Sequence, residues 1–153
     1  MTSRSFKRPE SVLVLVHTPT LDILLLERKE PSGFWQSVTG SLEDGEYPRE
    51  AAFRELVEET GLQMAPDDLR DWQHTNGFEI HPRWRHRYAP GVTHNTEHVF
   101  SLSLPTPRQV RLAPDEHTAQ IWLPAEAAAS KVFSWTNRDA ILELARRSRT
   151  SGV

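Results

Sequence analysis

Residues 40–62, GSLEDGEYPREAAFRELVEETGL, predict a short helix whose two ends are marked by a proline and a glycine. Pro48 favours the first turn of a helix, because its missing N–H is not needed there. Gly61 suits the position just after a helix, where the backbone often becomes left-handed. We therefore expect a helix that begins near Pro48 and ends before Gly61.

Four glutamates, Glu46, Glu55, Glu58 and Glu59, lie within fourteen residues of this stretch. At about 100° per residue, the last three fall within one arc of the helix. Such carboxylates repel one another unless a positive group lies among them. Mg²⁺ takes oxygen ligands and leaves room for phosphate oxygens, so the cluster is typical of a divalent-metal site. The alternative is a solvated acidic helix face that binds nothing.

The arc beside the carboxylates is largely apolar, so we expect this side of the helix to pack on a sheet; it consists of Ala52, Phe53, Leu56, Val57 and Thr60. Arg54 lies four residues before Glu58, which is the spacing of a helical ion pair. Glu46 precedes the helix, and we expect it to make a structural hydrogen bond to the loop or to Arg54.

The whole stretch resembles the signature of the Nudix hydrolases, and every specified position matches: Gly40, Glu46, Arg54, Glu55, Leu56, Glu58, Glu59, Gly61 and Leu62. The resemblance implies an α+β fold in which a mixed β-sheet lies between helices as an α/β/α sandwich. It also implies hydrolysis of pyrophosphate compounds with Mg²⁺, for which Mn²⁺ can substitute. We expect one Nudix domain over residues 1–153.

Further segments resemble one branch of that family, the bacterial pyrophosphohydrolases of folate biosynthesis. They are residues 7–9, 34–41, 78–80, 85–92, 95–97 and 134–135. The branch resemblance implies Mg²⁺-dependent hydrolysis of 7,8-dihydroneopterin triphosphate to the monophosphate and pyrophosphate. Two alternatives stay open: a Nudix enzyme acting on dATP or oxidised purine nucleotides, and a non-catalytic Nudix-fold module that binds a nucleotide.

Metal ligands and catalytic groups follow from the resemblance. Glu55 and Glu59 lie one helical turn apart and can chelate a common ion; the family places metal ligands at both positions. The branch adds Glu116, which spacing alone would class as a surface residue, with Asp115 as the nearby competitor. Glu58 is a further ligand or binds through water. The general base stays open between Glu55, Glu58 and Glu116.

Substrate contacts are also implied by the branch, at Lys7, Arg28, Thr39, Phe78, Glu79, Ile80, His81 and Ser134. The two cations can bind outer phosphates, although solvated charge at strand ends is an equal alternative. Phe78 can stack on a flat ring, or it can be a core aromatic in a strand. Glu79 can accept hydrogen bonds from ring N–H groups.

Composition narrows the class of protein. The 153-residue chain has a formal net charge of −3, which gives no overall attraction to nucleic acid or anionic membranes. It has no cysteine, which excludes disulfides and thiol chemistry. No run approaches the roughly 20 apolar residues of a membrane span. We expect a cytoplasmic protein with a small-molecule substrate and no nucleic-acid or membrane partner; the oligomeric state stays unknown.

The basic aromatic segment 83–88 should shape the pocket or a subunit contact.

Periodicity predicts the remaining elements. Strands are expected over residues 11–17, 22–27, 35–38, 71–80, 96–104 and 120–123, with a hairpin between the first two. Helices are expected over residues 124–130 and 137–146.

Overall fold

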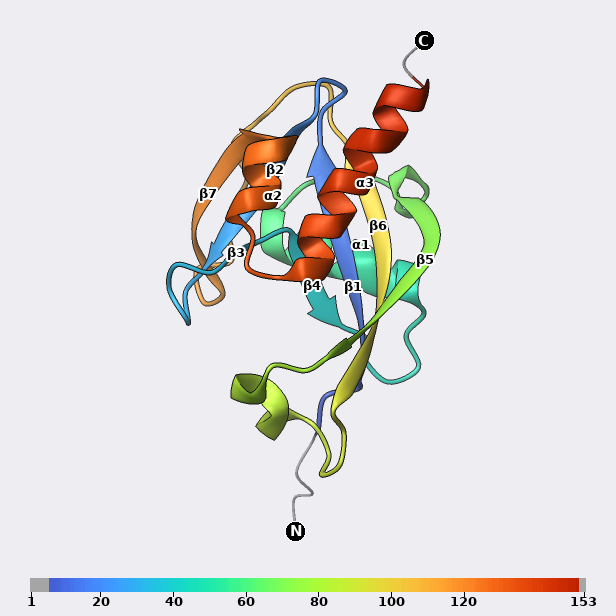
Figure 1. Ribbon diagram of the computed structural model, residues 1–153, viewed down its shortest axis with the longest axis vertical. Coiled ribbons are helices and arrows are strands. Elements are labelled where there is room, and N and C mark those ends of the chain that lie inside the picture. Colours follow the sequence, from blue (N-terminus) through green and yellow to red (C-terminus); the bar gives the residue numbers. More distant parts are fainter. Residues whose placement is uncertain (1–5, 152–153) are drawn as a thin grey trace.

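The computed structural model describes residues 6–151 and arranges them as a mixed sheet between helices (Figure 1). The strands are β1 Glu10–His17, β2 Asp22–Arg28, β3 Trp35–Gln36, β4 Val38–Ser41, β5 Arg70–Glu79, β6 His94–Ser103 and β7 His117–Pro124. The helices are α1 Pro48–Thr60, α2 Ala125–Lys131 and α3 Trp135–Ser151, with short 3-10 helices η1 Pro66–Asp68 and η2 Pro82–Arg87. Every predicted strand and helix is present, although the predicted strand 35–38 is divided into β3 and β4.

Strand β1 organises the sheet. It pairs with β6 in parallel along its whole length, and with β4 antiparallel on its other edge. The predicted hairpin joins β1 to β2 through the pair His17 and Ile23, after which β2 pairs with β7 and β3. Strand β5 pairs antiparallel with β6 at the far side of the sheet. One residue of β1, Ser11, is in register with Ser41 of β4 and with Glu97 of β6.

Both faces of β1 are buried, because successive side chains of a strand point to opposite faces. Val12, Val14 and Val16 belong to the core beneath α1. Leu13 and Leu15 belong to the core beneath α2 and α3. Figure 1 shows α1 behind the sheet and the other two helices in front of it, so the predicted α/β/α sandwich is confirmed.

Helix α1 begins and ends where the sequence predicts. Pro48 occupies its first turn, and the Glu50 carboxylate accepts a 2.8 Å hydrogen bond from the Tyr47 N–H. Gly61 has a φ of 67°, and its N–H donates to the Val57 carbonyl. Leu56 is fully buried against the sheet, so the apolar side of α1 fixes the direction of the neighbouring carboxylates.

Two other segments extend the sequence predictions. Most of the basic aromatic segment belongs to the 3-10 helix η2, and α3 starts at Trp135, earlier than expected. Within residues 6–151, no helix combines the length and apolar character needed to cross a bilayer.

Candidate active site

A cavity of about 900 Å³ brings the predicted site residues together. Its lining includes all eight expected substrate contacts and two expected metal ligands: Lys7, Arg28, Thr39, Glu55, Phe78, Glu79, Ile80, His81, Glu116 and Ser134. These residues come from segments far apart in sequence, so the fold assembles the site from both sides of β1. Their individual roles stay predictions.

Glu59 is the most buried acid of the site. Its side chain has no exposed surface, and neither of its carboxylate oxygens has a hydrogen-bond partner among the described residues. Burial raises the pKa of Glu59 well above its usual range, and the nearby Glu55 carboxyl raises it further. A buried carboxylate without a partner destabilises a fold, so this group fits a site that receives a cation.

Glu116 and His117 lie beside Glu59. One ligand atom from each of these three residues lies within 4.8 Å of the others. The His117 Nε2 atom is 3.8 Å from Glu59 Oε1. Burial and then the Arg28 charge lower the pKa of His117 to about 4, so its imidazole is neutral near pH 7 and does not neutralise Glu59.

Glu55 lies against Gly40. A Cβ atom added at Gly40 would stand only 2.1 Å from the Glu55 Cδ atom. The first glycine of the signature is therefore required because the Glu55 carboxylate occupies the place of a side chain. We call Glu55, Glu59 and Glu116 the carboxylate cluster.

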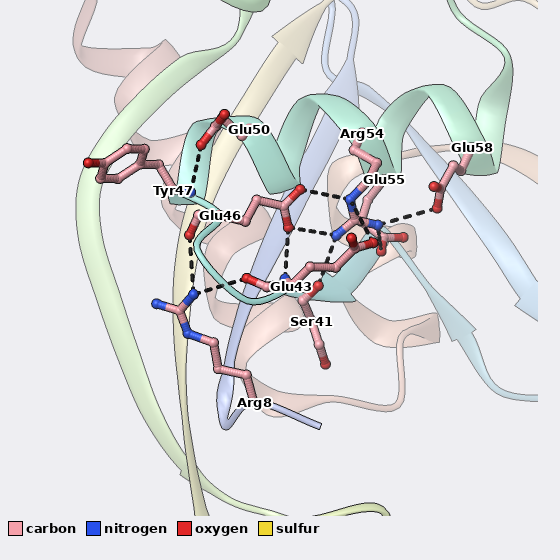
Figure 2. A network of polar contacts seen from close by, with 9 residues as sticks. All are labelled: Arg8, Ser41, Glu43, Glu46, Tyr47, Glu50, Arg54, Glu55 and Glu58. Carbon is pink, nitrogen blue, oxygen red and sulfur yellow. Dashed lines mark hydrogen bonds and ion pairs between the residues drawn. The ribbon is translucent and has the colours of Figure 1, made fainter. Parts of the chain in front are cut away.

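Arg54 holds the acidic side chains around α1 in place (Figure 2). Its guanidinium donates to both oxygens of Glu46 at 2.8 and 2.9 Å, to Glu55 at 2.7 Å and to the Ser41 carbonyl at 3.0 Å. The hydrogen bonds from Arg54 lower the pKa of Glu46. The prediction that Glu46 is structural is confirmed by these contacts and by its 2.9 Å bond from the Glu43 N–H.

Glu58 differs from its neighbour Glu59. Its carboxylate is 3.4 Å from Arg54, as the helical spacing predicted, but its side chain is 52% exposed. It lies outside the lining of the cavity in the described part of the chain. Partial burial and then the Glu55 charge raise the pKa of Glu58.

Two cations, Lys7 and Arg28, line the same cavity and interact electrostatically with acids of the carboxylate cluster. Partial burial and then Arg87 lower the pKa of Lys7, and the same two causes lower the pKa of Arg28. Each positive charge is thus destabilised by its surroundings, and an anionic group bound between them would offset that effect.

Strands β5 and β6 form another part of the cavity, which we call the β5–β6 wall (Phe78, Ile80, Asn95 and Glu97). Phe78 is directly opposite Asn95 in the strand pair, so their side chains share one face of the sheet. Near this wall, Glu79 forms an ion pair with Arg85, which leaves it less available to a ligand than the sequence suggested.

Aromatic side chains complete the cavity. Trp84 of η2 contacts Phe34 and Phe133, with ring centroids 6.4 and 5.9 Å apart. Arg28 lies over the Trp84 ring at 5.1 Å. The basic aromatic segment therefore shapes the cavity, as predicted. Trp135 also lines it, whereas Trp35 packs against the core beneath α2 and α3.

Six buried polar residues of the described chain that line the cavity had no role assigned from sequence: Ser11, Gln36, Asn95, Glu97, His117 and Asn137. His117 directly follows Glu116 at the start of β7, and neighbouring residues in a strand point to opposite sides. Because Glu116 still belongs to the turn before the strand, both side chains reach Glu59. Nothing local in the sequence signals this turn geometry.

The donor set fits a hard divalent cation. Glu59 and Glu116 supply oxygen ligands, which Mg²⁺ and Mn²⁺ prefer, and His117 adds one neutral imidazole nitrogen. Glu55 lies near enough to raise the pKa of both acids. The orphaned oxygens of Glu59 are the structural observation that favours a cation at this point.

Known proteins share this sequence and fold. A family model described as NUDIX domain matches residues 7–144. The chain is 47% identical over 144 residues to the dihydroneopterin triphosphate diphosphatase of Escherichia coli K12, a match that covers 92% of this chain and 95% of the relative. Its namesake from Haemophilus influenzae is 37% identical over 139 residues, with 89% and 87% covered.

A solved structure agrees with these relatives. The E. coli dihydroneopterin triphosphate pyrophosphohydrolase superposes with a TM-score of 0.84 at 48% identity, covering 90% of this chain and 95% of that one. The resemblance predicted from residues 40–62 is confirmed, and the chain belongs to the Nudix hydrolase family.

Proposed function

We propose that this chain hydrolyses 7,8-dihydroneopterin triphosphate to dihydroneopterin monophosphate and pyrophosphate, with Mg²⁺ as its cofactor. The relatives named for this substrate cover nearly the whole chain. The observation that carries the proposal is the cavity that is lined by Glu55 and Glu116 of the carboxylate cluster, by the cations Lys7 and Arg28, and by an aromatic and polar wall. A triphosphate joined to a flat heterocycle has groups that match each part.

The carboxylate cluster would hold the metal, with Glu59 as its most buried ligand. When bound, the cation supplies neutralisation of phosphate charge and lowers the pKa of bound water. Glu55 is oriented for this role by the 2.7 Å bond from Arg54, and Gly40 leaves room for its carboxylate.

Proton transfer falls to a carboxylate that reaches the cavity. Glu55 and Glu116 both line it, whereas Glu58 points beside Arg54 and is half exposed. The geometry therefore favours Glu55 or Glu116 as general base over Glu58. In the metal-free protein, partial burial and then the Glu55 charge raise the pKa of Glu116.

Lys7 and Arg28 would bind the oxygens of the outer phosphates by charge-assisted hydrogen bonds. Such contacts hold a triphosphate in one orientation and exclude water from around its oxygens. Phe78 would stack on the pterin ring at the far end of the substrate.

The test is turnover of dihydroneopterin triphosphate with and without Mg²⁺, with products resolved by phosphorus NMR. We expect metal-dependent release of pyrophosphate, faster than hydrolysis of dGTP or dATP. Faster hydrolysis of a nucleotide would overturn the substrate while keeping the chemistry. Tight binding without turnover of any of the three would instead identify a binding module.

A further inference from the structure

Two buried side chains of the β5–β6 wall have hydrogen-bond acceptors without partners. Asn95 is 3% exposed and Glu97 is 5% exposed, yet Asn95 Oδ1 and Glu97 Oε1 have no hydrogen-bond partner within the described part of the chain. Both residues line the cavity. Buried polar atoms are nearly always satisfied, and leaving one unpaired destabilises the protein. These two acceptors therefore point to a ligand.

The Asn95 side chain is held by its amide nitrogen. The Asn95 amide donates a 2.7 Å hydrogen bond to the Ser11 hydroxyl, which determines that its carbonyl oxygen is the group left over. Burial raises the pKa of Glu97, and the neighbouring Thr136 and Asn76 side chains lower it. Both residues thus have an acceptor that the protein leaves without a partner.

The two acceptors lie on one side of the sheet. Asn95 and Glu97 are two residues apart in β6, so their side chains project from the same face. Phe78, the cross-strand partner of Asn95, shares that face and supplies an apolar surface beside them. The arrangement combines adjacent acceptors with an aromatic ring, which suits a flat heterocycle with neighbouring N–H donors.

We propose that Asn95 Oδ1 and Glu97 Oε1 recognise the amino-pyrimidinone edge of the substrate, accepting hydrogen bonds from its 2-amino group and ring N–H. The assignment rests on the proposed function, because 7,8-dihydroneopterin carries this edge. Guanine has the same pair of donors, hypoxanthine lacks the 2-amino group, and adenine presents a ring acceptor instead of the ring N–H. These two residues determine specificity and take no part in bond cleavage.

Glu97→Gln tests the assignment with little change in shape. Glutamine replaces one carboxylate oxygen by an NH₂ group, which cannot accept hydrogen bonds from the donors of the base. We expect kcat/KM for dihydroneopterin triphosphate to fall about ten- to a hundredfold. Asn95→Leu, which removes the acceptor at similar volume, should act in the same direction. Glu126→Gln on the exposed surface of α2 is the matched control.

A pair of nucleotides separates recognition from folding. dGTP and dITP differ only in the 2-amino group, so the wild type should prefer dGTP, and both variants should lose that preference. Specificity constants are compared where the nucleotides are turned over, and inhibition constants where they are not. A variant that merely folds poorly would lose activity or affinity toward dGTP and dITP by the same factor and would keep the preference between them. If both variants behaved in this way, the assignment would be overturned.

The outcomes also separate this inference from the proposed function. If the wild type hydrolyses dihydroneopterin triphosphate and both variants match it in kcat/KM and nucleotide preference, only the edge recognition is wrong. If the wild type does not hydrolyse the pterin substrate but prefers dGTP to dITP, and Glu97→Gln lacks this preference, the proposed function is wrong and the edge recognition holds for guanine. If Glu97→Gln does not fold, Asn95→Leu decides.

Discussion

The carboxylate cluster, of which Glu55 and Glu116 line the cavity, and the β5–β6 wall are built in different ways. Glu55 and Glu59 come from one helix, and Glu55 is positioned by Arg54 and Gly40, all within the signature stretch. The β5–β6 wall joins two strands whose paired residues, such as Phe78 and Asn95, are distant in sequence. Two of the three carboxylates of the proposed metal site thus come from one helix, whereas the wall proposed to bind the heterocycle is assembled by the sheet. Chemistry and specificity should therefore respond to different substitutions.

The largest expected effect follows removal of one charge from the carboxylate cluster. Glu59→Gln should lower kcat about 1,000-fold, because a metal ion contributes several kcal/mol and each 1.36 kcal/mol is tenfold in rate. The loss should be similar for the pterin substrate, dGTP and dITP, unlike the selective loss expected at Glu97. Steady-state kinetics on the three substrates measure this. Full activity in Glu59→Gln would remove Glu59 from the metal site.

A second prediction compares two glycines. Gly40→Ala should lower kcat about 100-fold, because a new Cβ would displace the Glu55 carboxylate and small displacements of catalytic groups have effects of this size. Gly77→Ala on β5 is the control, since no atom lies within 4 Å of the added Cβ and its φ is not in the left-handed region. Equal kinetics in the two variants would show that Glu55 tolerates displacement.

The smallest expected effect is on stability. The raised pKa of Glu59 means that the metal-free native state still holds a proton where the unfolded chain has released it. Metal-free stability should therefore fall as pH rises from the ordinary carboxyl pKa, 4.5, through the raised value. Mg²⁺ binds the ionised carboxylate, so its stabilisation should grow over the same window.

Thermal unfolding measures this response to Mg²⁺. At ten times Kd the ion should add about 1.4 kcal/mol, which raises Tm by about 3–6 °C for a chain of this size. Glu59→Gln should lose the response, and Glu97→Gln should keep it. If Glu97→Gln also lost the response, the two parts of the cavity would not be independent.

The same contrast explains how much the sequence predicts. Helix α1 and its carboxylates are predictable because Pro48, Gly61 and the 3.6-residue repeat act within one stretch. The strands follow from apolar runs, and β1 has apolar residues toward both helical layers. The break between β3 and β4 is not predictable, because it depends on which neighbouring strand each residue pairs with.

Residues outside the signature are harder to predict. Glu116 reads as a surface residue, and only resemblance to a family connects it with the metal site. Asn95 and Glu97 lie in a segment that resembles the folate branch, but a role for them is inferred only from the acceptors that the structure leaves without partners. Whether a buried polar atom has a hydrogen-bond partner depends on its neighbours in space, so the sequence pattern alone cannot show it.

The register of β1 has a consequence for the length of acceptable substrates. Ser41 and Glu97 are both in register with Ser11, so two interstrand spacings, roughly 10 Å, separate the backbones that carry them. Backbone hydrogen bonds fix that span, and side-chain changes leave it intact. A compound whose ring and reactive phosphorus are joined by a shorter or longer chain can place only one end correctly. With the proposed sites for metal and heterocycle, the sheet would thus select by molecular length, in addition to any preference for the ring itself.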